Sequence, residues 1–289
     1  MDSQNLKAFI AVAECQSFSK AGERLFLTQP AVSKRISTLE DELDTPLFDR
    51  IGRTTQLTEA GHALLPRAKS ILLELDDAQR AINNLTGNIT GKLNIGTSHH
   101  IGLHRLAPVL KQFTKENPDV QLDIRFLDSE EGCNSVENGS LELAIVTLPS
   151  SPSAKLLIEE IWDDPLSFVF SVDHPLAKLN KALTIKDLAR HTAILPAVGT
   201  FTRDIIEVAC QKMGLELPIT METNYLETIK MMASIGLGWS ALPDQMVDED
   251  LAKASVDGLH LSRSLGTVIH KERTLSNAAQ ALLSILKTQ

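Results

Sequence analysis

The sequence predicts an α/β fold preceded by an all-α module that contains a winged helix-turn-helix. Two observations support this prediction. Residues 1–86 carry apolar side chains at helical spacing, whereas residues 92–242 alternate short apolar runs with helical patterns. Alternation of this kind is typical of a parallel sheet with helices on its faces. The second half of this block repeats the first in kind, so we expect two α/β lobes joined by crossing strands.

The composition indicates a soluble protein of the cytoplasm. The 289 residues suffice for two domains, and the hydrophobic share of 43% is that of a globular chain. No apolar run approaches the ~20 residues of a membrane span, and the N-terminus lacks the pattern of a secretory signal. Cys15, Cys133 and Cys210 are isolated and follow no C-x-x-C spacing. We therefore expect no disulfide framework and no membrane partner.

The net charge of −9 argues against nucleic acid as a partner of the chain as a whole. The distribution of charge points the other way. Four basic residues and a single acid, Glu23, lie between Lys20 and Leu39, and Arg50 and Arg53 follow shortly. A basic face of this size predicts that one small module contacts phosphate.

The N-terminal module is predicted to begin with three helices. Apolar spacing predicts the first over Leu6–Glu14 and a second over Ala21–Leu25, with Ser19 as its N-cap. Thr28 is expected to cap the third helix, in which Pro30 occupies an early position where its missing N–H costs nothing.

A β-hairpin wing and one long helix are predicted to follow. Asp49–Thr58 has the polar, arginine-bearing character of a wing. From Thr58 to about Leu85 a helix would extend roughly 40 Å at 1.5 Å per residue. Its apolar stripe needs a partner helix, and Gly87–Gly91 is the expected linker after it. The stripe comprises Leu64, Leu65, Ala68, Ile71, Leu72, Leu75, Ala78 and Ile82.

The outer face of the third helix carries residue types that read DNA. An α-helix fits the major groove, where its N-terminal side chains reach base edges. Gln29 can contact adenine through two hydrogen bonds, and Ser33 and Lys34 lie one turn further along the same face. The nearby arginines are better placed for phosphate or the minor groove. Spacing alone also fits a helical bundle whose charges face water. The predicted DNA-binding residues are Ser19, Thr28, Gln29, Pro30, Ser33, Lys34, Arg35, Arg50, Arg53 and Thr54.

Five short motifs resemble the N-terminal signature of LysR-type transcriptional regulators. They occur in the same order and spacing as in that family, at Ala21–Leu25, Thr28–Ser33, Leu39–Leu43, Pro46–Arg50 and Leu57–Gly61. The motifs match closely over residues 1–65 and less closely beyond. At the level of domain architecture, the resemblance covers the whole chain.

This resemblance implies how the chain is organised and what it binds. It implies a DNA-binding domain at 1–58, a dimerisation helix at 59–86, a hinge at 87–91 and a periplasmic-binding-protein-like effector domain at 92–289. Within the last domain, lobe 1 would comprise about 92–161 and 267–289, and lobe 2 about 162–266. It further implies a homodimer on a near-palindromic operator, a homotetramer on DNA, RNA polymerase as a partner, and a small anionic or polar metabolite as effector.

An effector site is predicted where strands of the two lobes end. The first strand ends at Thr97–His100, directly before a helix, and hydroxyls with free backbone N–H groups suit an anion. In LysR-type regulators this strand end lines the effector pocket. The alternative for Ser98 is that it only caps the next helix. His99 and His100 can both reach one pocket only if the strand has ended. The predicted effector-binding residues are Thr97, Ser98, His99, His100, Asp128, Ser129, Thr147, Pro196, Gly199, Thr200 and Asn224.

Metal and thiol chemistry are weaker alternatives. His99, His100 and His104 could bind zinc by residue type, but no cysteine or patterned carboxylate completes a site, so no metal and no cofactor are predicted. Peroxide sensors of the family use two cysteines; Cys210 lies near one such position and Phe201 stands at the other. We therefore expect no disulfide switch. The residues from Thr97 to Thr147 also resemble members that sense sulfate or acetylserine.

Other functional classes find less support in the sequence. The chain has no G-x-S-x-G, Walker or H-E-x-x-H motif, so an enzyme is not expected. A solute-binding module would share the C-terminal lobes, but it would not carry residues 1–60.

Overall fold

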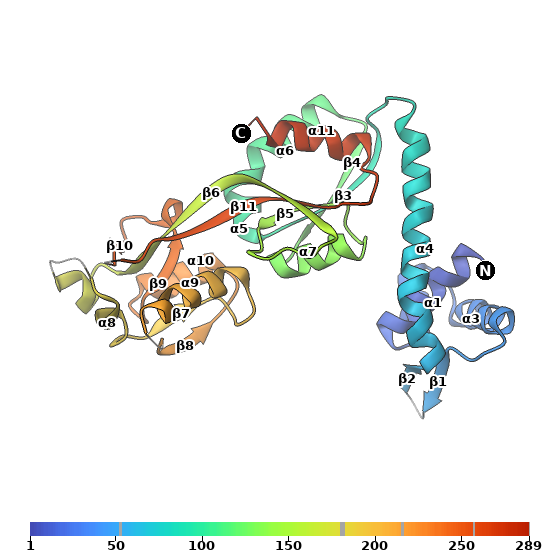
Figure 1. Ribbon diagram of the computed structural model, residues 1–289, viewed down its shortest axis with the longest axis horizontal. Helices are drawn as coiled ribbons and strands as arrows, with labels where there is room; N and C mark the ends of the chain where they lie inside the picture. Colours follow the sequence, from blue (N-terminus) through green and yellow to red (C-terminus); the bar gives the residue numbers. More distant parts are fainter. Residues whose placement is uncertain (52–53, 180–182, 215–216, 257, 289) are drawn as a thin grey trace. The chain divides into compact units, whose positions relative to one another are not determined.

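The computed structural model describes residues 1–51, 54–179, 183–214, 217–256 and 258–288. The chain divides into two compact units, Met1–Thr86 and Gly87–Gln289 (Figure 1). Among the described helices, none is both long enough and apolar enough to cross a membrane.

The first unit is a winged helix-turn-helix, as the sequence predicts. Helices α1 (Ser3–Cys15), α2 (Phe18–Leu25) and α3 (Gln29–Leu43) pack around a common core, and β1 (Phe48–Ile51) pairs antiparallel with β2 (Thr54–Leu57) to form the wing. The core consists of fully buried or nearly buried apolar side chains: Leu6, Ala8, Phe9, Ala11, Val12, Ala21, Val32, Ile36, Leu39, Leu47, Phe48 and Ala68.

Capping side chains fix where these helices begin. Thr28 caps α3 as predicted, because its Oγ1 accepts a hydrogen bond from the N–H of Ala31 at 3.4 Å. The prediction that Ser19 caps α2 is wrong. Ser17 does so, with its Oγ accepting from the N–H of Lys20 at 3.3 Å. The helix begins earlier because Phe18 packs against the core. The centroids of the Phe18 and Phe48 rings are 5.8 Å apart.

The turn between α2 and α3 depends on a close backbone approach. A Cβ at Gly22 would lie 2.7 Å from the carbonyl oxygen of Leu27, so no larger residue fits there without movement of the backbone. Phe26 ends α2 in the left-handed conformation with φ of 56°, and 96% of its surface is exposed. A side chain other than glycine, asparagine or aspartate is uncommon in this conformation.

Helix α4 (Glu59–Asn84) divides its apolar stripe between two environments. Its N-terminal half packs on the core of the same unit through Leu64, Leu65 and Leu72. In the C-terminal half, by contrast, Leu75 and Ile82 are 51% and 63% exposed. The stripe is therefore covered over only half of its length by the unit's own residues.

The second unit begins with the predicted βαβαβ pattern. Strand β3 (Gly91–Thr97) pairs in parallel with β4 (Val120–Phe126) on one side and β5 (Leu143–Thr147) on the other, and helices connect the three strands. The helix expected directly after the first strand starts at His99 and contains a π-helical turn. These elements are β3 (Gly91–Thr97), α5 (His99–Ile101), η1 (Gly102–Leu106), α6 (Ala107–Glu116), β4 (Val120–Phe126), α7 (Ser129–Glu137) and β5 (Leu143–Thr147). With α11 (Asn277–Leu286), which packs on α6, they form lobe 1.

Lobe 2 has its own core around Trp239. This side chain is fully buried, and its Nε1 donates to the carbonyl oxygens of Leu188 and His191, both at 3.0 Å. Strands β7 and β8 pair in parallel. The elements of lobe 2 are η2 (Pro175–Leu179), α8 (Ile185–Leu188), β7 (Ala193–Leu195), α9 (Phe201–Lys212), β8 (Ile219–Glu222), α10 (Leu226–Ser234), β9 (Ser240–Pro243), η3 (Asp244–Met246) and β10 (Leu251–Ala254).

Two long antiparallel strands run through both lobes, β6 (Leu156–Ser171) and β11 (Leu261–His270) (Figure 1). They lie between β10 and β5 in the sheet order β10-β6-β11-β5-β3-β4, and β9 also pairs with β6. The pairing shifts register at Leu265/Gly266. A Cβ at Gly266 would clash with the carbonyl oxygen of Glu159, so glycine is required where the two strands approach each other.

Candidate functional site

Helix α3 exposes the polar face that the sequence predicts. Gln29, Pro30 and Lys34 are exposed and Ser33 is partly exposed, while Val32 and Ile36 are buried on the opposite side. The Nε2 of Gln29 donates to the Oγ of Ser33 at 3.1 Å, which places both side chains on one face. The N-terminal turns of α3 therefore present hydrogen-bonding groups to solvent.

The other predicted DNA-binding residues lie on several elements of the first unit, and those described differ in exposure. Ser19 and Thr28 are exposed. Arg35 is partly buried because its Nη1 donates to the Oε1 of Gln4 in α1 at 3.2 Å. Arg50 and Thr54 lie on the two strands of the wing, and Arg53 lies outside the described residues.

A small cavity of about 50 Å³ in the second unit brings together nine of the predicted effector residues. Its walls come from both lobes. Helices α7, α9 and α10 begin at this cavity, and their backbone N–H groups carry the positive end of the helix dipole. The lining residues are Ser98, His99, His100, Asp128, Ser129, Glu130, Thr147, Pro196, Thr200, Thr202, Asn224, Leu226 and Arg263.

Two predicted residues lie outside the cavity lining. Thr97 is fully buried, and its Oγ1 donates to the carbonyl oxygen of Ile145 at 2.8 Å within the sheet. Gly199 has φ of +87° and forms a turn before α9. Ser98 lines the cavity and also caps α5, because its Oγ accepts from the N–H of Ile101 at 3.5 Å.

The protein's own carboxylates bridge the two lobes at this cavity. The Nδ2 of Asn224 donates to Asp128 of lobe 1 at 2.7 Å, while its Oδ1 accepts from the N–H of Ala197 at 2.9 Å. The carboxylate of Glu130 accepts from the N–H of Phe201 at the start of α9. Burial raises the pKa of Glu130, and the backbone hydrogen bond opposes this rise. An acidic group therefore already occupies the N-terminus of α9.

A buried arginine, not anticipated from the sequence, forms one wall. Arg263 is 4% exposed; it forms an ion pair with Asp164 and donates to the Oγ1 of Thr202 at 3.1 Å. Burial lowers the pKa of Arg263, while the Asp164 carboxylate opposes the shift. Glu130, Thr202, Leu226 and Arg263 line the cavity but were not predicted, because the tertiary fold brings these positions within helices and β11 to it. A charged residue within an apolar strand was the one available indication.

The adjacent histidines point in different directions because a helix begins at His99. The ring of His99 lies against Phe126 at 5.2 Å and Tyr225 at 5.0 Å between centroids. The ring of His100 is buried, and neither of its nitrogens has a hydrogen-bond partner among the described residues. Burial, with the positive charge of Arg263, lowers the pKa of His100 to about 3.

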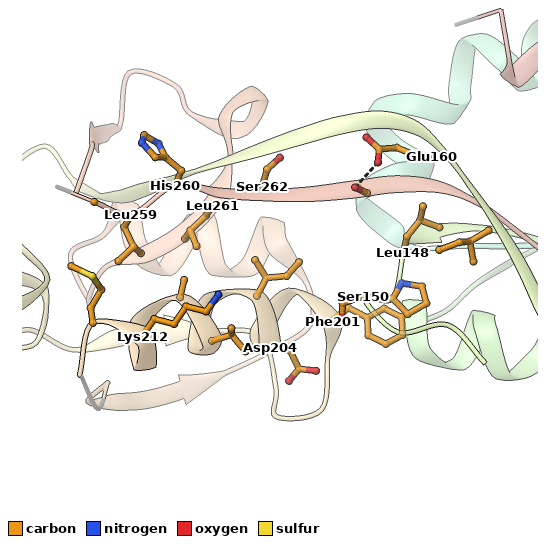
Figure 2. A pocket seen from close by; sticks show the side chains of 18 residues that line it. Leu148, Ser150, Glu160, Phe201, Asp204, Lys212, Leu259, His260, Leu261 and Ser262 are labelled. Atoms are coloured by element: carbon orange, nitrogen blue, oxygen red, sulfur yellow. Dashed lines mark hydrogen bonds between the residues drawn. The ribbon is translucent and has the colours of Figure 1, made fainter. Parts of the chain in front are cut away.

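A larger cavity of about 680 Å³ lies between the Leu148–Ser150 segment, α9 and β11 (Figure 2). Its walls mix apolar side chains such as Val208 and Leu259 with polar and charged ones, among them Asp204 and Lys212 on α9. Size alone would favour this cavity. The smaller one has the convergent donors and buried charges that characterise specific recognition of polar ligands.

The cysteines of the second unit are not in a reactive environment. Cys133 and Cys210 are 6% and 1% exposed, and burial raises the pKa of each thiol to about 11. The thiolate is the reactive form in oxidation and disulfide exchange. These environments give no support to a thiol switch.

A winged module with an exposed polar helix face, together with a polar cavity between two α/β lobes, is the architecture of a transcription regulator with an effector-binding domain. Two family models match the chain: "Bacterial regulatory helix-turn-helix protein, lysR family" over residues 3–62 and "LysR substrate binding domain" over residues 86–289. The chain belongs to the LysR family of DNA-binding transcription regulators.

Individual relatives agree with this assignment. The chain is 32% identical over 286 residues to a probable RuBisCO transcriptional regulator of Nostoc sp., covering 96% of this chain and 85% of that protein. A full-length OxyR variant from Pseudomonas aeruginosa has a similar fold, with a TM-score of 0.74, 23% identity and coverage of 99% and 95%. CbnR complexed with its target DNA gives a TM-score of 0.66 at 21% identity, with coverage of 100% and 99%.

Proposed function

We propose that this regulator is switched by a small anionic metabolite that binds in the cavity between Ser98 and Ser129 of lobe 1 and Thr200 and Asn224 of lobe 2. The observation that carries the proposal is the convergence of the N-termini of α7, α9 and α10 on this cavity, beside buried Arg263. Together these groups favour negative charge.

The effector would act by replacing the protein's own carboxylates. A cavity of about 50 Å³ holds about one or two water molecules, so a metabolite enters only if the lobes separate. An effector anion would compete with Glu130 for the N–H of Phe201 and with Asp128 for Asn224. The ratio of its affinities for the wider and the narrower arrangement then sets how far the equilibrium between these two arrangements shifts.

On DNA, we assign base contacts to Gln29, Ser33 and Lys34 and backbone contacts to the remaining predicted residues. The exposed half of the α4 stripe supports a homodimer through this helix, since an apolar stripe of this kind is usually covered. A two-fold dimer would bind a near-palindromic operator. We extend the proposal to a homotetramer on DNA, contact with RNA polymerase, a cytoplasmic location and no catalytic turnover.

Fluorescence anisotropy on the DNA upstream of the protein's own gene tests the DNA half of the proposal. Gln29→Ala is expected to lower affinity for this DNA by about tenfold while leaving affinity for random DNA unchanged. Ser37→Ala, at an exposed position later in α3, is the matched control. Equal losses on both DNAs for Gln29→Ala would contradict base reading by this residue.

Thermal unfolding with a panel of ligands tests the effector half. The panel comprises sulfate, phosphate, dicarboxylic acids and hydroxycarboxylic acids, with sugars and nucleosides as neutral members. Glu130→Gln removes the competing charge at α9, so we expect it to increase stabilisation by the anion that binds the wild type. Stabilisation by neutral members only would contradict the anionic class.

A further inference from the structure

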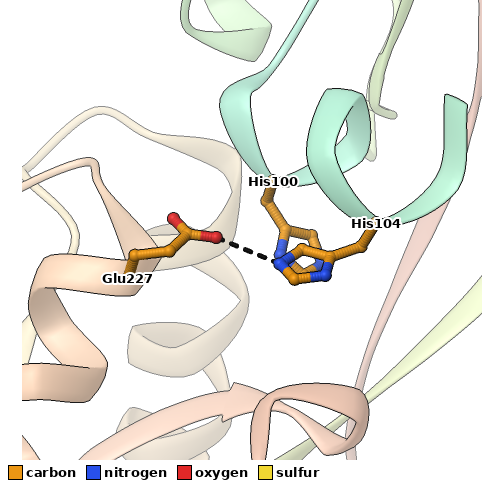
Figure 3. A group of neighbouring side chains, drawn as sticks. All are labelled: His100, His104 and Glu227. Carbon is orange, nitrogen blue, oxygen red and sulfur yellow. Dashed lines mark hydrogen bonds and ion pairs between the residues drawn. The ribbon is translucent and has the colours of Figure 1, made fainter. Parts of the chain in front are cut away.

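We propose that His100, His104 and Glu227 form a site for a divalent transition-metal ion, best suited to Zn²⁺, which joins the two lobes. Their candidate ligand atoms all lie within 4.8 Å of one another. Figure 3 shows the two imidazoles and the carboxylate converging from opposite sides of the interlobe space. This set differs from the His99, His100 and His104 alternative of the sequence, because Glu227 takes the place of His99.

The two histidines lie on one face of a continuous helical segment. They are four residues apart across α5 and η1, and their ring centroids are 4.8 Å apart. Spacing of this kind places two imidazoles where they can bind one metal ion. Glu227 belongs to the first turn of α10 in lobe 2, and its Oε1 lies 3.1 Å from the Nε2 of His104.

The environment of His100 gives a second, independent indication. Its side chain is 4% exposed, and both ring nitrogens lack hydrogen-bond partners among the described residues. Buried polar atoms are nearly always paired, so an unpaired ring nitrogen requires an explanation. A metal ion bonded to one nitrogen would supply the missing partner.

The ligand distances fit zinc after small side-chain movements. With Zn–N and Zn–O bonds of about 2.0–2.2 Å, tetrahedral ligands lie about 3.3–3.5 Å from one another. The His104–Glu227 pair is already near this separation, at 3.1 Å. Two imidazoles and one carboxylate leave a fourth position for water, and this ligand set favours zinc over magnesium or calcium.

Neighbouring positive charges are largely compensated. Arg263 and Arg105 both lie beside the buried carboxylate of Asp164, with Arg105 at 3.5 Å. The Glu227 carboxylate adds a negative charge on the other side of the proposed ion. The remaining positive charge favours hydroxide over neutral water at the fourth position. His100 also lines the effector cavity, so the proposed ion would lie beside that cavity.

A metal held in this way would favour the arrangement in which the lobes are close. His100 and His104 belong to lobe 1, whereas Glu227 belongs to lobe 2, so separation of the lobes breaks the site. Any ligand that separates the lobes would then lower the affinity for the metal. The metal would lower the affinity for that ligand by the same factor.

Calorimetric titration of ZnCl₂ into the full-length protein, after removal of metals with a chelator, tests the site. We expect one ion bound per chain. Glu227→Gln and His104→Gln each remove one ligand from a different lobe, and each should lower zinc affinity at least about tenfold. Both side chains are partly exposed, which limits the effect of these changes on folding. His260→Gln, at an exposed histidine directly before β11, is the control and should leave affinity unchanged.

Titration with Co²⁺ gives a second measurement, since a tetrahedral site produces a strong visible absorption spectrum. We expect this spectrum in the wild type and in His260→Gln, and its loss in Glu227→Gln and His104→Gln. Equal zinc affinity in all four proteins, or a wild type that binds no ion, would overturn the proposal. Both titrations are made without the ligands of the effector panel, so a failure of the metal site is distinguishable from a failure of the proposed effector site.

Discussion

Asn224 and Asp128 join the two lobes of the effector unit directly, with the Nδ2 of the amide 2.7 Å from the carboxylate. Asn224 is held in turn by the N–H of Ala197. This hydrogen bond thus joins residues 96 positions apart in the chain across the proposed effector site.

Asn224→Ala should loosen this connection. Loss of a hydrogen bond to a charged group costs about 1.5–3 kcal/mol, and the exposure of Asp128 places the effect at the lower end. Urea unfolding of the full-length protein measures the loss. Asn134→Ala, at an exposed position on α7, should be nearly neutral. Equal stability of the two variants would show that the interlobe hydrogen bond contributes little.

The Arg263–Asp164 pair should behave as a buried ion pair. Arg263→Met leaves the Asp164 carboxylate without its main partner, which we expect to destabilise the fold by about 3–5 kcal/mol. Replacing both residues together, with Arg263→Met and Asp164→Leu, should recover much of that loss. A double-mutant cycle by chemical denaturation measures the coupling, and strictly additive effects would contradict it.

The turn of the helix-turn-helix can be stabilised at Phe26. Because this residue has φ of 56° and an exposed ring, Phe26→Asn should raise stability by about 0.5–1 kcal/mol. Phe26→Ala removes the same ring without favouring the left-handed conformation, so it serves as the control. Thermal unfolding distinguishes the two variants, and a gain from alanine equal to that from asparagine would assign the effect to the ring.

Dimerisation should depend on the exposed half of the α4 stripe. Leu75→Asp combined with Ile82→Asp places charges on this stripe, and we expect the dimer dissociation constant to rise by at least about tenfold. Asn83→Asp adds a charge on a different face of the same helix and should have little effect. Sedimentation velocity reports the association state, and an unchanged dimer in the double variant would place the interface elsewhere.

The cysteines should differ in their reaction with iodoacetamide. Cys133 and Cys210 have pKa values raised to about 11, so only about one thiol in a thousand is ionised at pH 8. Cys15 is partly exposed and should be alkylated first in the native protein. Since the thiolate reacts, each added pH unit below 11 should increase the rate at the buried pair about tenfold while the fold persists. Mass spectrometry identifies the modified residue, and rapid native labelling of Cys210 would revive a redox role.

Sequence reasoning succeeded where local pattern determines structure. The capping side chain of Thr28, the polar face of α3 and the strand ends at Ser98 and Asp128 follow from short stretches of sequence. It failed at Ser19, because the packing of Phe18 on the core moves the start of α2 to Phe18 and its cap to Ser17.

The remaining site residues come together only through the tertiary fold. Arg263 reaches the cavity on β11 and Glu227 reaches His104 from α10, across 123 positions in the chain. No spacing rule joins positions so far apart. Thr97 was expected in the cavity, but its hydroxyl donates to the carbonyl oxygen of Ile145 in the neighbouring strand. This partner is also distant in the chain, so the local sequence could not reveal it.

The passage of β6 and β11 through both lobes limits the kind of motion that an effector can induce. Two continuous, hydrogen-bonded strands resist stretching and sideways bending, whereas a two-stranded ribbon can change its twist at modest cost. The register shift beside Gly266 is the point at which the added twist is most easily absorbed. The separation of the lobes that a metabolite requires should therefore occur through a rotation of one lobe about the ribbon axis, which opens the cavity as its walls turn past each other.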